Sequence, residues 1–150
     1  IAPVADAPTL SGTFDSLTSG LSYIDSAGAI SPRIAALAEG GFVTVWSRSN
    51  GAGGYDLFAR FLDADGQPVN TTVAIATDSS GFTDADAKVE ALAGGGFVVV
   101  WRSDRGDSDI YARVFDAAGN SVGGEVPVNL GNSVYDLVPQ VTALTGGASR

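Results

Sequence analysis

Short apolar blocks separated by glycine-rich turns recur along the chain. The first block is Phe42–Trp46, which reads FVTVW and follows the turn Gly40-Gly41. The second is Phe97–Trp101, which reads FVVVW and follows Gly95-Gly96. Short blocks of β-branched and aromatic residues bounded by glycine are typical of β-strands. No stretch shows a sustained apolar period of 3.6 residues, so the pattern predicts an all-β protein.

A second shared phrase follows each block and completes a repeat. YDLFARFLDADGQPV at Tyr55–Val69 matches SDIYARVFDAAGNSV at Ser108–Val122. The two tryptophans are 55 residues apart (101 − 46), and the phrases that follow them are 53 apart (108 − 55). A third copy begins with PQVTALTGG at residues 139–147. Self-similarity at a fixed period is the signature of a repeat architecture.

Each repeat divides into four strand candidates. In the first repeat they are Arg33–Leu37, Phe42–Trp46, Asp56–Leu62 and Val69–Ala76. Alternation along the third strand predicts two faces, one with Leu57, Ala59 and Phe61 and the other with Phe58, Arg60 and Leu62. Both faces carry apolar residues, so we expect each sheet to be covered on both sides.

The repeats also give a plan of the whole chain. We expect a linker-like segment at 1–12, strands completing a neighbouring unit at 13–31, repeat units at 32–86 and 87–138, and the start of a third unit at 139–150. Four-stranded antiparallel units of about 50 residues, covered on both faces, are typical of β-propeller blades. A β-sandwich or an open barrel is the alternative.

Two such units should be marginally stable alone, because each buries its faces against its neighbours. The third copy stops before its expected Trp, so we expect the parent protein to continue with an apolar strand that ends in Trp. We also expect self-association, since the exposed strand edges of an interrupted array can pair with a second copy.

Composition narrows the classes of function. Asp and Glu number 17 against 8 Lys and Arg, and the resulting net charge of −9 argues against nucleic-acid binding. No apolar run approaches the roughly 18 residues of a membrane span, so no membrane insertion is expected. The sequence has neither Cys nor His, which removes disulfides, thiolate metal sites and the commonest general base.

The two tryptophans are the first candidates for a binding site. Trp46 and Trp101 each end the most apolar strand of a unit and precede a polar loop. An exposed indole face could stack on a sugar, with Arg48, Arg102 and Asp104 as polar partners. The other interpretation, which we favour, is that each Trp packs between neighbouring units. Surface glycans or proteins are the partners that the first interpretation implies.

Several repeated polar residues are expected to be structural. Arg60 and Arg113 lie in apolar strands, where an unpaired charge would be costly, and Asp56 and Asp109 begin the same strands. We expect an Asp–Arg network between neighbouring strands. Gly66 and Gly119 end the turns after these strands, where the left-handed backbone favours glycine.

Calcium is the only cofactor that the acidic residues suggest. Asp104, Asp107 and Asp109 cluster in the loop after Trp101 and form the candidate metal site. The turn that starts at Asp63 resembles the beginning of a calcium loop but lacks the later acidic ligand. A solvated acidic loop is the alternative for both.

No carboxylate pair is unique to one unit, as catalytic residues should be, so we expect a protein that is not an enzyme. The motifs P-x-V/I-x-A-L-x-x-G-G-F-V-V-V-W and D-I-Y-A-R-x-F-D-x-x-G resemble repeats of very large secreted bacterial proteins of the RTX-type, adhesin-like kind. The resemblance covers roughly residues 32–147 and implies a secreted or cell-surface location. It implies a structural or adhesive module, with a carbohydrate-binding module as the alternative. The RTX calcium nonapeptide is absent, so the resemblance brings no calcium ligands with it.

Overall fold

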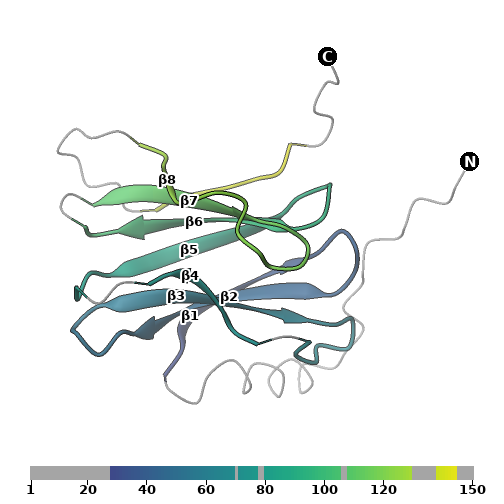
Figure 1. Cartoon of the computed structure of the whole chain (residues 1–150), viewed down its shortest axis with the longest axis horizontal. Coiled ribbons are helices and arrows are strands. Elements are labelled where there is room, and N and C mark those ends of the chain that lie inside the picture. The colour runs from purple at the N-terminus through teal and green to yellow at the C-terminus, as the bar shows by residue number, and fades with distance from the viewer. Residues whose placement is uncertain (1–27, 70, 78–79, 106–107, 130–137, 145–150) are drawn as a thin grey trace, which may run out of the picture.

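Two antiparallel sheets of four strands make up most of the described chain (Figure 1). The computed structural model describes residues 28–69, 71–77, 80–105, 108–129 and 138–144. The first sheet contains β1 (Ile30–Ala36), β2 (Phe42–Ser49), β3 (Tyr55–Leu62) and β4 (Val73–Ala76). The second contains β5 (Asp84–Ala91), β6 (Phe97–Ser103), β7 (Asp109–Phe115) and β8 (Val126–Pro127). In both sheets the strands lie side by side in chain order.

The prediction of an all-β protein built from four-stranded antiparallel units is confirmed. Across the described residues the two sheets remain separate and do not close into a barrel. The segments 1–12 and most of 13–31 lie outside the described residues. No helix in the described part of the chain is long and apolar enough to cross a membrane.

The first strand of each sheet begins earlier than the sequence predicts. β1 begins at Ile30, although 13–31 was assigned to a neighbouring unit, and β5 begins at Asp84, ahead of the expected boundary at 87. Each strand is interrupted by a register shift, and one residue there has a positive φ, 53° at Ser31 and 56° at Asp86. This irregularity breaks the alternation, so the sequence pattern conceals the start of both strands.

The fourth strand is shorter than predicted. The segment Val69–Ala76 was expected to be one strand, but the ladder with β3 covers only Val73–Ala76. Among the described residues before it, Pro68 forms an isolated bridge with Leu62, and the Val69 N–H donates to the carbonyl oxygen of Phe61.

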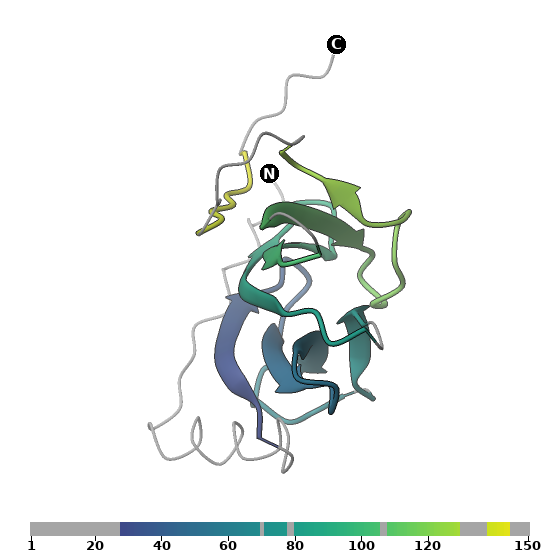
Figure 2. The ribbon, with the colours of Figure 1, turned by 90° about the vertical axis from the view of Figure 1, so that its left-hand side faces the viewer.

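The two sheets stack face to face around one core (Figure 2). Val43, Val45 and Phe61 of the first sheet pack in the same cluster as Phe97, Val99 and Trp101 of the second. The register pairs Val43 with Phe61 and Val45 with Ala59, so these side chains share one face of the first sheet. The predicted division of β3 into two apolar faces is therefore present, with Leu57, Ala59 and Phe61 on the inner face.

The stacking is head to tail. Val43 and Val45 face the second sheet, but their repeat equivalents Val98 and Val100 lie on the face of the second sheet that points away. Conversely, Trp101 faces the first sheet, whereas its equivalent Trp46 lies on the opposite face from Val45. At this interface the first sheet therefore presents one face of the repeat, and the second sheet presents the opposite face.

Tight turns join the first two strands of each sheet. Gly41 and Gly96 hold φ values of 75° and 81°, where side chains are disfavoured. A Cβ on Gly41 would also collide with the carbonyl oxygen of Leu62, and one on Gly96 with that of Phe115. The second glycine of each Gly-Gly pair is thus required, because the neighbouring strand passes directly against it.

Candidate functional site

Trp101 is completely buried between the two sheets. Its exposed fraction is 0%, and its ring stacks on Tyr111 of the neighbouring strand with the centroids 6.1 Å apart. Its Nε1 donates a hydrogen bond to Oδ1 of Asp84 at 3.0 Å. The ring is therefore packed, and its N–H is hydrogen-bonded, within the protein.

Trp46 occupies the equivalent position in the first sheet and is also buried, with an exposed fraction of 1%. It stacks on Phe58 at 6.3 Å, and the guanidinium of Arg48 lies 4.1 Å from the centre of the Phe58 ring. Ala29 packs here, at the position that Asp84 holds in the second unit (84 − 55 = 29). Within the described residues the indole Nε1 of Trp46 has no hydrogen-bond partner.

These two positions do not fit the interpretation of the tryptophans as sugar platforms. Stacking on a pyranose requires an open indole face, and both faces are covered in this structure. Arg48, the proposed polar partner at the first platform, covers Phe58 instead. The packing interpretation accounts for the burial.

A charged cluster that does not repeat lies beside Trp101. Arg105 donates from Nη2 to Oδ2 of Asp84 at 3.1 Å and from Nη1 to Oε2 of Glu125 at 2.7 Å. Its guanidinium carbon lies 5.4 Å from the centre of the Tyr111 ring. Asp84 has a buried side chain, so this cluster ties β5 and the loop after β6 to the chain just before β8.

Burial raises the pKa of the Asp84 carboxyl above its ordinary value of 3.8, and it outweighs the opposing hydrogen bonds and the Arg105 charge. Folding therefore favours the protonated carboxyl. The stability that this preference contributes is complete below the ordinary pKa, and it is lost as the pH rises through the folded pKa.

We accordingly expect the wild-type chain to lose stability relative to Asp84→Asn as the pH rises from about 3 to about 7. Urea unfolding of both chains across this range measures the difference. A difference that stays constant, or one that grows in favour of the wild type at higher pH, would contradict the assignment of a raised pKa to Asp84.

The remaining polar candidates hold the loops together. Arg102 pairs through Nε with Oδ2 of Asp86 at 3.1 Å, and the Asp104 carboxylate accepts the backbone N–H of Thr83. Asp109 accepts a hydrogen bond from Nδ2 of Asn129 at 3.4 Å. Arg48, Arg102 and Asp104 thus each contact a different group in this structure.

The candidate metal site is only partly within the described residues, because Asp107 lies outside them. In the described ranges no three acidic side chains converge as metal ligands. The Asp63 turn is closed by its own backbone, since Oδ1 accepts the N–H groups of Asp65 and Gln67 at 3.0 and 2.8 Å. Asp116 makes the same turn, and a hydrogen bond from the Asn120 side chain lowers its pKa. A calcium requirement stays a prediction.

Arg113 does not form the predicted Asp–Arg network. Its Nη1 donates to the carbonyl oxygen of Ile75 in the first sheet at 2.8 Å, and its guanidinium carbon lies 5.5 Å from the Phe115 ring centre. Asp109 pairs with Asn129 and not with Arg113. In the first unit, Asp56 lies directly opposite Arg48 across β2 and β3, and Arg60 lies opposite Thr44.

The bond between Arg113 and Ile75 joins the two sheets, so its loss should be measurable. We expect Arg113→Met to lower the free energy of unfolding by about 1.5–3 kcal/mol, because it removes a hydrogen bond made by a charged group. Arg33→Met is the matched control, since the exposed Arg33 donates, within the described ranges, only to its neighbour Pro32. The control should change stability by about 0.5 kcal/mol or less. Equal effects in a denaturant titration would mean that Arg113 does not hold the sheets together.

The turn glycines take the predicted left-handed backbone, with φ of 79° at Gly66 and 84° at Gly119. Gly119 has a second role at the contact between the sheets. A Cβ there would lie 2.6 Å from Cε2 of Phe61 and 3.6 Å from Cγ2 of Val73. A Cβ on Gly66 would meet no atom within 4 Å.

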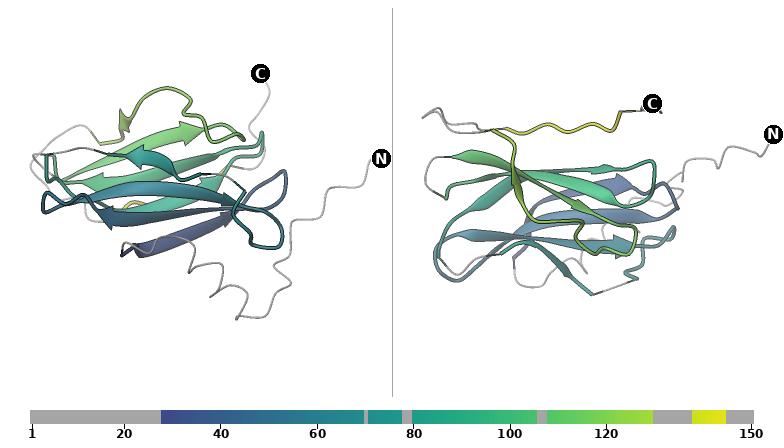
Figure 3. Two further views of the ribbon diagram at one scale, coloured as in Figure 1. Left: turned by 60° about the horizontal axis from the view of Figure 1, so that its bottom comes forward. Right: turned by 45° about the horizontal axis from the view of Figure 1, so that its top comes forward.

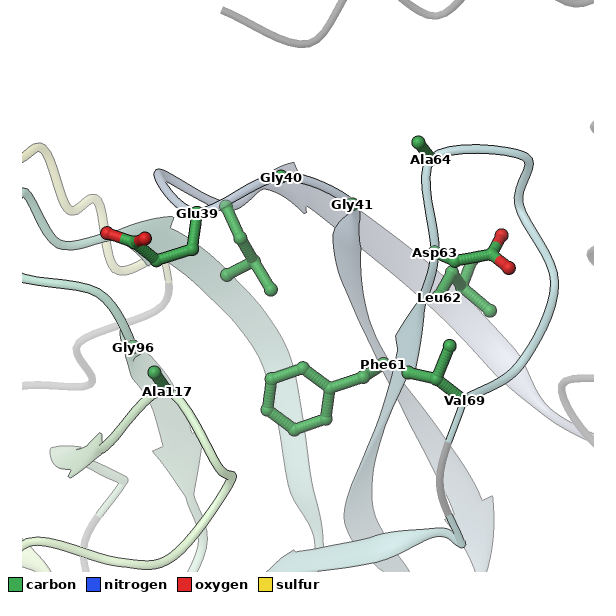
Figure 4. Close-up of a pocket in the computed structure, with 11 residues that line it drawn as sticks. Glu39, Gly40, Gly41, Phe61, Leu62, Asp63, Ala64, Val69, Gly96 and Ala117 are labelled. Atoms are coloured by element: carbon green, nitrogen blue, oxygen red, sulfur yellow. The ribbon is translucent and has the colours of Figure 1, made fainter. Parts of the chain in front are cut away.

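A hollow of about 430 Å³ opens where the turns of the two units meet (Figure 4). Phe61 and Leu37 supply apolar lining, and the carboxylates of Glu39 and Asp63 stand on either side of it. The Asp63 carboxylate is engaged by its own turn, as described above. The hollow therefore has an apolar lining with few free polar groups, which does not define a substrate.

Comparisons with known proteins give no relative from which function could be transferred. No protein-family model, curated protein or solved structure matches the chain.

Sequence reasoning missed the charged cluster of Asp84, Arg105 and Glu125. A signal for it was present in the repeat alignment, because Asp84 aligns with Ala29, and a polar residue facing an apolar one marks a contact specific to one unit. The partners could not be found in this way, since Arg105 and Glu125 lie in loops with no counterpart in the alternation of the strands.

Proposed function

We propose that the chain is a non-catalytic structural module of a large secreted or surface-attached bacterial protein. The observation that carries the proposal is the use of the repeated residues. Both tryptophans are buried, and Arg113 joins one sheet to the next. Trp101 and Arg113, which both have counterparts in the first unit, thus serve the contact between units, and such contacts are what a solenoid or blade array requires.

The secreted location is supported by the resemblance of the GGFVVVW and DIYARVFD phrases to repeats of secreted adhesin-like chains. The net charge of −9 and the absence of cysteine accord with it. An antibody against the chain should detect it in the culture medium or on intact cells of the source bacterium. Detection only inside the cells would contradict this part of the proposal.

The carbohydrate-binding alternative is less well supported than it was from the sequence, because its two aromatic platforms are covered. A catalytic role has equally little support. Contrary to the expectation from the sequence, Asp84 and Glu125 are a carboxylate pair that only one of the two described units carries. Both carboxylates bond Arg105, which suits a structural tie between loops.

A glycan array probed with the chain in calcium and again in EDTA tests the proposal. We expect no specific glycan to be retained in either buffer. Specific binding that survives EDTA would overturn the structural role in favour of a lectin. Binding lost in EDTA would do the same and would place the ligand at a calcium site, for which Asp104→Asn and Asp109→Asn are the first variants to examine.

A further inference from the structure

The outer face of the second sheet is apolar and partly exposed. Val98, Val100, Ala112 and Val114 share this face, because the register pairs Val98 with Val114 and Val100 with Ala112. Val114 is 37% exposed, and Val126 and Val128 at the far edge are 58% and 59% exposed. Apolar residues on one face of a sheet normally pack against another layer.

The repeat alignment shows that the same face of the first sheet is buried. Each of its residues has an equivalent on the inner face of the first sheet, and those equivalents are buried against the second sheet. The pairs are Val98 with Val43, Val100 with Val45, Ala112 with Ala59, Val114 with Phe61 and Val128 with Ile75. Ile75 is 0% exposed, whereas Val128 is 59% exposed. The outer face of the second sheet therefore matches the buried inner face of the first sheet, but no second sheet covers it among the described residues.

The start of the third repeat already lies against this face. Residues 138–144 run along the outer side of the second sheet (Figure 3, right). Val138, Pro139 and Gln140 enclose a hollow of about 310 Å³ together with Val100, Ile110 and Val128. β5 occupies the corresponding position on the first sheet, where it packs against β1, β2 and β3. Figure 2 shows β1, β5 and residues 138–144 toward one side of the molecule and β4 and β8 toward the other.

This face also has an equivalent of the carbonyl oxygen that accepts the hydrogen bond between the sheets. In the covered interface, Arg113 of the second sheet donates to the carbonyl oxygen of Ile75. The equivalent acceptor on the outer face is the carbonyl oxygen of Val128, at the exposed edge. Arg60 holds the same position in the first unit as Arg113 in the second, so an arginine there belongs to the repeated pattern.

We propose that the outer face of the second sheet binds a further four-stranded unit of the same pattern, stacked head to tail. The strand of that unit equivalent to Phe97–Trp101 covers Val98 and Val114, and its arginine equivalent to Arg113 bonds the carbonyl oxygen of Val128. The inference rests on the proposed role as a repeat module. It differs from the edge-to-edge association predicted from the sequence, because it uses the face of the sheet. The two-residue β8 also offers little edge for pairing.

The test uses an extended chain in which residues 1–144 are followed directly by a second copy of residues 93–129. Leu144 aligns with Leu92, so the copy completes a third unit in frame. We expect the extended chain to unfold in one transition, with a melting temperature several degrees above that of the original chain, because each added interface stabilises a repeat array. Val114→Lys should change the melting temperature of the original chain by about 2 °C or less, and it should lower the melting temperature of the extended chain by clearly more. Replacing the added copy's equivalent of Arg113 with Met should also lower it.

Carbene footprinting supplies a readout that does not depend on stability. Labelling of Val126 and Val128 should fall at least threefold in the extended chain. The proposal is overturned if the added residues unfold in a separate transition, if Val114→Lys affects both chains equally, or if labelling of the two valines is unchanged. Glycan binding by the original chain would remove the structural role but leave these outcomes untouched, so the two failures can be told apart.

Discussion

Replacing Trp101 with alanine is expected to lower the free energy of unfolding by about 3–5 kcal/mol. The side chain has no exposed surface, and it fills space in the core that both sheets share. The neighbouring sheets cannot close over so large a void without breaking the strand register, so the loss of contacts persists. Urea titration followed by circular dichroism measures the change. A loss of about 1 kcal/mol or less would mean that Trp101 is peripheral to the core.

The paired tryptophans allow a sharper form of this experiment. Trp101→Phe removes a hydrogen bond to the buried Asp84, whereas Trp46→Phe removes none among the described residues. Both variants lose a similar ring volume, so the difference between them isolates the bond. Trp101→Phe should be the more destabilising by about 1–3 kcal/mol, the cost of leaving a buried polar group short of a partner. Equal losses would show that Asp84 finds a replacement donor.

Gly41→Ala should lower the free energy of unfolding by about 2–5 kcal/mol, the sum of left-handed backbone strain and overpacking. Its new Cβ would collide with the carbonyl oxygen of Leu62, a backbone atom held in the ladder between β2 and β3.

Gly40→Ala is the matched control for this substitution. Gly40 also has a positive φ, of 98°, but a Cβ there meets no atom within 4 Å. The control should lose only about 1–2 kcal/mol from backbone strain. If the two variants are equally stable in thermal melts, the strand does not pass as close to the turn as the structure places it.

The sequence predicts the strands well where local chemistry defines them. The Gly40-Gly41 turn predicts the start of β2 at Phe42 correctly, although β2 continues past Trp46 to Ser49, where a loop is predicted. Alternation in β3 assigns both of its faces correctly. The starts of β1 and β5 could not be predicted, because a residue with positive φ at Ser31 and Asp86 breaks the alternation.

Side-chain partners were the least predictable part of the candidate site. The partner of Arg113 is a backbone carbonyl, which has no signature in the sequence, so a carboxylate was expected in its place. The burial of Trp46 and Trp101 depends on which sheet stacks on which face. Contacts between units determine which faces stack, so the residue pattern within one unit does not predict the burial of either tryptophan.

Head-to-tail stacking gives this protein a direction. The face that the first sheet offers at the interface differs from the face that the second sheet offers, so the contact is heterologous, and contacts of this kind are not limited to pairs. Whether such a series returns on itself as a ring or continues as a filament depends on the rotation from one sheet to the next. Gly119 lies at the contact between the two sheets, where a Cβ would stand 2.6 Å from Cε2 of Phe61. A single methyl group at this position would push the sheets apart locally, so the angle between them, and with it the form of any longer series, is sensitive to one missing side chain.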